Sequence, residues 1–209
     1  MVKKLKHSVE ETLTEIKNKK FLSRIDLIKL NEAYQKVLLW FFSYPTKEVS
    51  LNDLSSTTKI SKTTANRVVA QLSGEGFLKK EVLGRIWRVS CNQSHIYNFS
   101  IKISYNLRII YESGIIEKIH EIVENPRAII LFGSYRRGDD TEKSDIDIAV
   151  GVLGDEELRI RQLGIIPKLG YRNNVTVNLH IFSRNKIDLN LFSNIANGIV
   201  LEGFLEARP

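Results

Sequence analysis

The sequence predicts an α+β protein with two domains joined by a connector. Helical periodicity and one hairpin pattern dominate residues 1–92, whereas strand-like runs alternate with helical ones in residues 126–209. Charge divides the chain in a similar way. Residues 1–90 contain 17 Lys and Arg and 9 Asp and Glu, a net charge of +8, and the remaining residues contain 14 and 15, a net charge of −1. We therefore expect a basic N-terminal domain, a connector over residues 93–125 and a near-neutral C-terminal domain.

Composition excludes several classes of protein. With 43% hydrophobic residues among 209, the chain can bury real cores, which argues against global disorder. The sequence has no apolar run near the roughly 18 residues of a membrane span, and its basic beginning lacks the apolar core of a signal peptide. The single cysteine, Cys91, permits no internal disulfide and favours a reducing, cytoplasmic setting.

In the first half of the chain, the positions of cap, proline and turn residues predict short helices followed by a hairpin. Residues 1–30 are expected to be helical, and Asn31 is a candidate cap for a helix that ends before Pro45. The core candidates of that helix are Val37, Leu38, Phe41 and Phe42. The elements expected next are a strand at Glu48–Ser50, a helix at Leu51–Thr57, a helix from the N-cap Ser61 to Ser73, and two strands around a turn near Gly84.

This order of elements resembles a winged helix-turn-helix domain over residues 32–92. The resemblance implies binding to DNA, with the Ser61–Ser73 helix in the major groove and the hairpin on the backbone. The residues expected to contact DNA are Lys62, Thr63, Asn66 and Arg67 on the helix and Lys79, Lys80, Arg85 and Arg88 on the hairpin. Winged helices also bind proteins, so a protein-interaction module is the alternative. A homodimer is a further expectation, through residues 1–30 or 98–124.

The second half alternates strands and helices. After a helical connector with apolar residues three and four apart, we expect strands at RAIILFG, IDIAVGV and NVTVNLHIFS. A helix is expected over Glu156–Leu169, between the second and third strands. The tail KIDLNLFSNIANGIVLEG is expected to form a helix and a short closing segment.

The candidate metal- and phosphate-binding residues lie in the stretch LFGSYRRGDDTEKSDIDIAV. In a strand, residues two apart point the same way, so Asp145 and Asp147 share one face while Ile146 and Ile148 pack in the core. Two adjacent carboxylates repel each other unless a cation lies between them, and Mg²⁺ accepts carboxylate and phosphate oxygens. Gly133 permits close approach of a ligand, and the hydroxyl of Ser134 can hold a phosphate. This pattern suits a metal-bound nucleoside triphosphate.

The same stretch resembles the signature of the polymerase-β-like nucleotidyltransferases, in which an apolar strand and Gly-Ser precede Asp-hydrophobic-Asp by about ten residues. The resemblance covers residues 115–204 and implies a minimal nucleotidyltransferase domain with a small mixed sheet flanked by helices. It implies that Gly133 and Ser134 contact the triphosphate of ATP or another NTP. It also implies that Asp145 and Asp147 are the catalytic and metal-binding residues. They would hold two Mg²⁺ or Mn²⁺ ions, one on the triphosphate and one that lowers the pKa of the attacking hydroxyl. Arg136 and Arg137 are candidates for neutralising phosphate charge.

One position departs from the family pattern. Catalytic members usually carry a third acid on the neighbouring strand, and the residue that aligns with it in VTVNLHIFS is Asn178. An amide is a poor ligand for the catalytic metal and no base. His180 lies on the same face and is an alternative base or a structural hydrogen-bonding group. The acids Asp155, Glu156 and Glu157 are alternatives if they fold back toward the site.

Two functional hypotheses follow from the sequence. The first is a Mg²⁺-dependent nucleotidyltransferase that moves NMP from an NTP to a hydroxyl of a protein or nucleic acid, and is tethered to a DNA-binding winged helix. By resemblance to antitoxin-like members, a partner toxin is a candidate acceptor. The second is a catalytically degenerate, nucleotide-binding transcriptional regulator or antitoxin-like DNA-binding protein. The intact Gly-Ser and Asp-x-Asp pattern favours the first hypothesis, and Asn178 favours the second.

Overall fold

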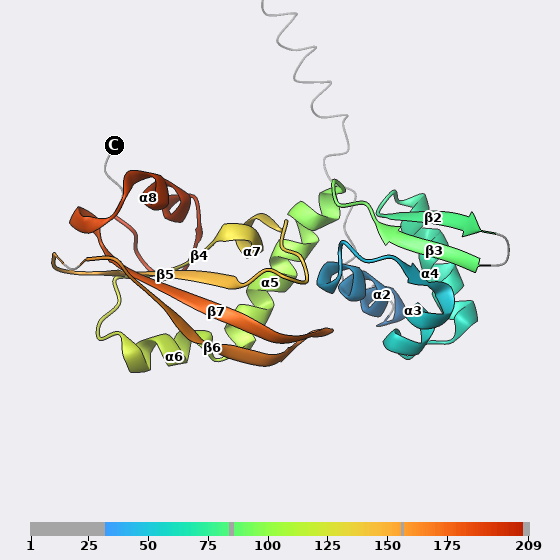
Figure 1. Cartoon of the computed structure of the whole chain (residues 1–209), viewed down its shortest axis with the longest axis horizontal. Coiled ribbons are helices and arrows are strands. Elements are labelled where there is room, and N and C mark those ends of the chain that lie inside the picture. The colour runs from blue at the N-terminus through green and yellow to red at the C-terminus, as the bar shows by residue number, and fades with distance from the viewer. Residues whose placement is uncertain (1–31, 84–85, 156, 207–209) are drawn as a thin grey trace, which may run out of the picture. The chain divides into compact units, whose positions relative to one another are not determined.

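The computed structural model describes residues 32–83, 86–155 and 157–206 (Figure 1). The expectations for residues 1–30, Asn31, the turn at Gly84 with Arg85, and Glu156 therefore lie outside the described residues. Within the described ranges, no helix has both the length and the apolar character needed to cross a membrane.

Residues 32–91 form three helices and a small antiparallel sheet. The elements are α2 (Glu32–Ser43), β1 (Val49–Ser50), α3 (Leu51–Thr58), α4 (Lys62–Gly74), β2 (Leu78–Leu83) and β3 (Ile86–Cys91). Strand β3 lies between β1 and β2 and pairs antiparallel with both (Figure 1). The predicted core of α2 is confirmed, since Val37, Leu38, Phe41 and Phe42 are all buried.

Local capping explains where the two short helices begin. The hydroxyl of Ser50 accepts a hydrogen bond from the Asp53 backbone N–H at the start of α3. The hydroxyl of Ser61 accepts one from the Thr64 backbone N–H at the start of α4, which confirms the predicted N-cap. Lys59 adopts φ 54° between the helices, so the chain turns sharply there. The turn leaves α4 with its polar face exposed and Val68, Val69 and Leu72 buried.

The second half is a five-stranded mixed sheet in the order β6-β7-β5-β4-β8. Its strands are β4 (Ala128–Phe132), β5 (Ile146–Val152), β6 (Arg159–Leu169), β7 (Arg172–Ser183) and β8 (Ile199–Gly203). The pair β5 and β7 is parallel, and every other pair is antiparallel. Its helices are α5 (Ile101–Glu112), α6 (Ile115–Ile122), α7 (Gly133–Arg137) and α8 (Leu189–Ala196), with short 3₁₀ turns at Ile96–Phe99 and Arg184–Lys186.

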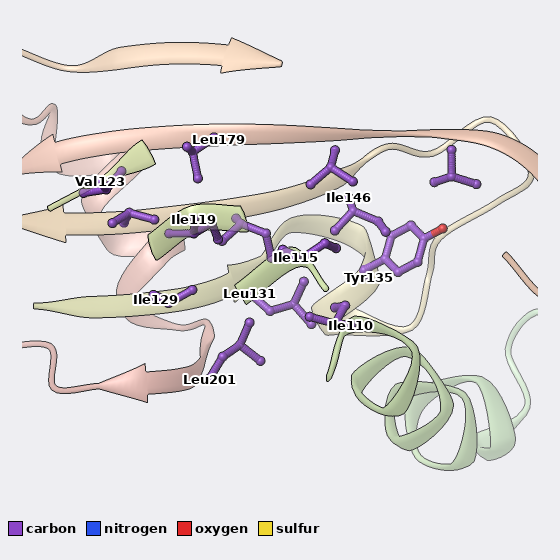
Figure 2. Packing of buried hydrophobic residues seen from close by; sticks show 14 of the residues in the cluster. Ile110, Ile115, Ile119, Val123, Ile129, Leu131, Tyr135, Ile146, Leu179 and Leu201 are labelled. Atoms are coloured by element: carbon purple, nitrogen blue, oxygen red, sulfur yellow. The ribbon is translucent and has the colours of Figure 1, made fainter. Parts of the chain in front are cut away.

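The sheet buries apolar side chains on both faces. Helix α8 covers one face (Figure 1). There Ile195 packs with Ala128, Ile130 and Phe132 of β4, Ala149 of β5 and Phe182 of β7. On the other face, helices α5 and α6 and the ring of Tyr135 cover the larger core, which Figure 2 shows in close view. Ile146, Ile148 and Val150 of β5 point into this larger core, and each is 0% exposed. The odd-numbered positions of β5, including Asp147, therefore face the α8 side.

The expected helix over Glu156–Leu169 is wrong. Residues 159–169 form β6, which pairs with β7 through a hairpin in which Leu169 opposes Arg172. The two-residue turn begins at Gly170, whose φ of 60° is unstrained for glycine. Gly164 and Pro167 would both weaken a helix interior, and Pro167 is tolerated because β6 is an edge strand. Pairing with β7 therefore outweighed the helical pattern of the apolar residues.

The predicted connector is part of the C-terminal core. Gly114, with φ 75°, separates α5 from α6, so the helical stretch is two helices rather than one. Ile110, Ile115 and Ile119 join the larger core (Figure 2). Tyr111 and Ile122, which fit the same periodicity, are 52% and 36% exposed. The spacing therefore identified the helical character, and the glycine break decided which residues reach the core.

Candidate nucleotide site

The turn after β4 brings Gly133 against Asp147. Gly133 begins α7 with φ 71°, a conformation that side-chain-bearing residues rarely adopt. A Cβ atom added to Gly133 would lie 2.9 Å from Asp147 Oδ2. The glycine is thus required both by its backbone conformation and by the carboxylate beside it.

Asp145 and Asp147 lie at the beginning of β5. Asp145 directly precedes the strand and is exposed, and Asp147 is half-buried between the buried neighbours Ile146 and Ile148. In the sheet register, Asp147 pairs with Phe132 of β4 on one side and with Asn178 of β7 on the other. The beginning of β5 therefore carries two carboxylates, one directly before the strand and one within it.

Asn178 lies beside both carboxylates. Its Nδ2 atom is 3.4 Å from Asp145 Oδ2 and 3.3 Å from Asp147 Oδ1, so the amide donates long hydrogen bonds to both. The position aligned with a third acid thus lies on the strand next to the aspartates and carries an amide. Because an amide is neutral, the cluster carries two negative charges rather than three.

His180 lies one step further along β7, beside Asp147. Its Nε2 atom is 3.5 Å from Asp147 Oδ1, and its ring packs edge-on against Phe132 with 5.0 Å between ring centroids. Both ring nitrogens are buried, and neither makes a hydrogen bond within the described residues. Asp155 and Glu157, the other candidate acids, instead lie near Lys186, at 3.8 and 3.6 Å from its Nζ.

A polar pocket adjoins the turn. It is lined by Phe132 and Gly133, by Arg136 and Arg137 of α7, and by Asn194 and Asn197 at the end of α8. Arg137 also forms an ion pair with Asp139, with 2.9 Å between Nε and Oδ2. Sequence reasoning placed the two arginines near the phosphates but missed the two asparagines. The only signal for them was the polar pattern of NIANG in the predicted tail helix.

A buried polar network holds the loop between α7 and β5. Asp140 is 3% exposed, and its Oδ1 is 3.2 Å from Nζ of Lys102 on α5, which is 1% exposed. Burial raises the pKa of Asp140 and lowers the pKa of Lys102, and the charge of each opposes the shift of the other. Arg172 of β7 donates to the Tyr135 hydroxyl and, at 2.7 Å, to the Ser144 carbonyl oxygen. Sequence reasoning did not identify these residues.

The donor set at the aspartates fits one hard divalent cation. In proteins, Mg²⁺ is usually held by one or two carboxylates together with water and substrate phosphates. Asp145 and Asp147 supply two carboxylates that share the Asn178 amide, and Gly133, which lies against Asp147, also lines the polar pocket. Among the described residues there is no group of three or more His, Cys, Asp or Glu side chains suited to a metal. These residues therefore do not form an all-protein metal cage, and water or phosphate oxygens would have to complete the coordination.

The candidate DNA-contacting residues lie on the surface of the N-terminal half. Lys62, Thr63, Asn66 and Arg67 share the exposed face of α4. On the hairpin, Lys79 and Lys80 are exposed, and the Lys80 ammonium lies 3.3 Å from the centroid of the Trp87 ring. Arg88 is exposed but is 3.4 Å from Glu48, so part of its charge is compensated.

Comparison with known protein families gives a match for the C-terminal part of the chain. A search of curated proteins found no matching relative. A scan against protein families matched residues 115–203, the segment from α6 to β8, to the family described as Polymerase beta, Nucleotidyltransferase. This segment contains the Gly133 turn, both aspartates and Asn178. Residues 115–203 are thus similar to a polymerase-β-type nucleotidyltransferase domain, which indicates nucleotidyl transfer in general terms.

Proposed function

We propose that the chain binds a Mg²⁺-nucleoside triphosphate at the Gly133 turn and transfers NMP to a hydroxyl group of a protein or nucleic acid, with pyrophosphate as the leaving group. The observation that carries this proposal is the packing of the Asp147 carboxylate against Gly133, with the Asp145 carboxylate near enough that one amide, that of Asn178, donates to both. The family match over residues 115–203 supports the same reaction class.

The chain's own residues divide into three roles in this proposal. Gly133 leaves room for the triphosphate beside the carboxylates, and Ser134 donates a hydroxyl hydrogen bond to a phosphate oxygen. Arg136 and Arg137 line the adjoining pocket and would neutralise phosphate charge. Asp145 and Asp147 would hold Mg²⁺. When bound, Mg²⁺ supplies charge neutralisation on the triphosphate and lowers the pKa of an attacking hydroxyl.

Asn178 is the reason for a second candidate function. Its Nδ2 lies 3.3–3.4 Å from both carboxylates, at the position where a third acid would act. An amide cannot accept a proton from the acceptor hydroxyl at neutral pH. A protein that binds nucleotide without turnover, and acts as a regulator or antitoxin-like DNA-binding protein, is therefore the alternative.

A labelling assay separates the two functions. The full chain is incubated with Mg²⁺ and each labelled NTP in turn, ATP first, with cell lysate as the source of acceptors. The Asp145→Ala/Asp147→Ala variant is the matched control. Transfer of label above this control supports the enzyme. Nucleotide binding by the wild-type chain without transfer would support the regulator, and the absence of both would rule out the site itself.

We also propose that residues 32–92 are a winged helix-turn-helix domain that binds DNA. Three features support this proposal: the order α2, β1, α3, α4, β2, β3, the exposed polar face of α4, and the net charge of +8 in residues 1–90. A toxin-like protein acceptor, a homodimer and a cytoplasmic location remain expectations from the sequence.

A further inference from the structure

The loop between α7 and β5 sets the geometry of the proposed nucleotide site. Gly133 and Asp145 lie at the two ends of the segment formed by α7 and this loop, and residues 138–145 contain neither helix nor strand. An irregular segment of this length loses conformational entropy when it is fixed in one arrangement. The pairing of Phe132 with Asp147 places Gly133 beside Asp147. Interactions outside the segment must hold the rest of it, and their positions decide how far the phosphate turn lies from Asp145.

Helix α5 supplies part of that support. Lys102, Asn106 and Ile110 are four residues apart, and all three are buried on one face of the helix. Lys102 pairs with Asp140 in the middle of the loop, with 3.2 Å between Nζ and Oδ1, and its ammonium also donates to the Asp140 carbonyl oxygen. Asn106 Nδ2 lies 3.0 Å from the Tyr135 carbonyl oxygen and 2.9 Å from Asp140 Oδ1. One amide thus links α7 to the loop.

Arg172 supports the other end of the loop. It begins β7 and is 6% exposed, and its guanidinium donates to the Tyr135 hydroxyl from Nη1 and to the Ser144 carbonyl from Nη2. Ser144 directly precedes Asp145, so this hydrogen bond fixes the peptide that carries the first aspartate. A planar guanidinium can hold both partners at once, whereas an ammonium cannot reproduce the same fork.

The loop also passes very close to a neighbouring backbone. A Cβ added to Gly138, which has φ 80°, would lie 1.9 Å from the carbonyl oxygen of Asn98. At its beginning, directly after α7, the loop therefore packs against the segment that precedes α5. Further along, at Asp140, it is bonded to side chains of α5 itself. Both contacts come from residues before position 115, where the match to the nucleotidyltransferase family begins.

We propose that Lys102, Asn106 and Arg172 are positioning residues of the nucleotide site. Acting through Asp140, Tyr135 and Ser144, they hold the Gly133–Ser134 turn and Asp145 at the separation that a metal-bound triphosphate requires. A buried ion pair contributes little net stability compared with apolar packing, so a role in fixing one arrangement accounts better for burying Lys102 with Asp140. The inference rests on the proposed function, because it assigns these residues to that site.

Two substitutions in the full chain test this role. Asn106→Leu removes both amide hydrogen bonds and keeps the number of side-chain heavy atoms, and Arg172→Lys keeps the charge but removes the fork. The matched control is Ile110→Ala, on the same buried face of α5 but outside the network. We expect amide hydrogens of residues 138–145 to exchange at least tenfold faster in both test variants. The Kd for Mg²⁺-ATP, measured by calorimetry, should rise at least tenfold, and the control should change neither quantity.

The outcomes are distinguishable. If both test variants fold, keep wild-type exchange in residues 138–145 and bind Mg²⁺-ATP as tightly as the wild-type chain, the positioning role is wrong. Equal effects of Ile110→Ala would also overturn it, because general loss of stability would then explain the result. A wild-type chain that binds no NTP removes the proposed function, and the exchange rates alone then decide whether the network fixes the loop.

Discussion

Asn178 is the residue that bears most directly on the proposed enzymatic function. In Asn178→Asp, the amide that donates to Asp145 and Asp147 is replaced by a third carboxylate. Without metal, repulsion among three carboxylates should lower the free energy of unfolding by about 1–2 kcal/mol. With Mn²⁺ or Mg²⁺, the added charge should tighten metal binding about tenfold, which corresponds to about 1.4 kcal/mol. Calorimetric titration with Mn²⁺ and thermal unfolding with and without metal measure both effects.

Asn173→Asp is the matched control for this prediction. Asn173 is an exposed asparagine on the same strand. Its replacement by aspartate therefore adds the same negative charge at a position away from the two carboxylates. Equal Mn²⁺ affinities in the two variants would show that position 178 has no special relation to the metal. Increased label transfer in Asn178→Asp alone would identify the asparagine as the residue that limits turnover.

Gly133 should tolerate no side chain, for two separable reasons. Gly133→Ala places a Cβ in a left-handed conformation, at a cost of about 1–2 kcal/mol, and 2.9 Å from Asp147 Oδ2. Gly154 also has a positive φ, 114°, but a Cβ there meets nothing within 4 Å. Gly154→Ala therefore measures backbone strain alone. We expect both variants to lose stability in chemical denaturation, and only Gly133→Ala to lose nucleotide binding. Normal binding by Gly133→Ala would contradict the close contact with Asp147.

Local pattern was sufficient to predict one part of the site. The period of two in a strand places Asp145 and Asp147 on one face, and the next parallel strand places Asn178 beside them. Arg172, Asn194 and Lys102 could not be predicted in the same way. Their positions near the site depend on how β7, α8 and α5 pack around the sheet, and no short-range spacing records that packing. One pattern in the sequence does point to the buried polar residues of α5. Lys102 and Asn106 lie eight and four residues before the apolar Ile110, a spacing that places all three on one face of a helix.

At the scale of whole elements, β6 shows how pairing decides between competing patterns. Residues 159–169 have apolar residues at both helical and strand-like spacings, so periodicity alone was ambiguous. Gly164, Pro167 and the turn at Gly170 favour a hairpin, and β7 supplies an edge for pairing. The strands β4 and β5 and the helix α8 were predictable because their apolar runs and caps agreed with each other.

Helix α5 should be required for the C-terminal domain to fold. A fragment of residues 100–206 retains Lys102, Asn106 and Ile110, whereas a fragment of residues 115–206 begins where the family match begins. The shorter fragment loses the ion pair between Lys102 and Asp140 and exposes the apolar side chains of the larger core that α5 covers. Breaking a buried ion pair by removing one partner typically costs about 3–5 kcal/mol. We expect cooperative thermal unfolding from the longer fragment and none from the shorter one, as measured by circular dichroism. Cooperative unfolding of the shorter fragment at a similar temperature would place α5 outside the domain.

At the scale of the whole molecule, the two halves of the chain differ in charge and in proposed ligand. The positive excess lies entirely in residues 1–90, whereas the half that resembles a nucleotidyltransferase is close to neutral. If DNA binding belongs to the first half, its salt dependence must come from cations there. A protein that neutralises several phosphates releases the same number of counterions, so the slope of log affinity against log salt counts those contacts.

The salt dependence of DNA affinity therefore tests whether the first half of the chain is the part that binds DNA. We expect the full chain to bind duplex DNA with an affinity that falls steeply as salt rises, and the fragment of residues 100–206 to bind none. Lys62→Gln/Arg67→Gln removes two cations from the exposed face of α4 and should reduce the slope by about 2. Arg161→Gln/Lys168→Gln removes two exposed cations from β6 and should leave the slope unchanged. Fluorescence anisotropy over a range of salt measures each slope. An equal reduction in both variants would mean that DNA responds only to total charge, and α4 would then have no specific part in binding.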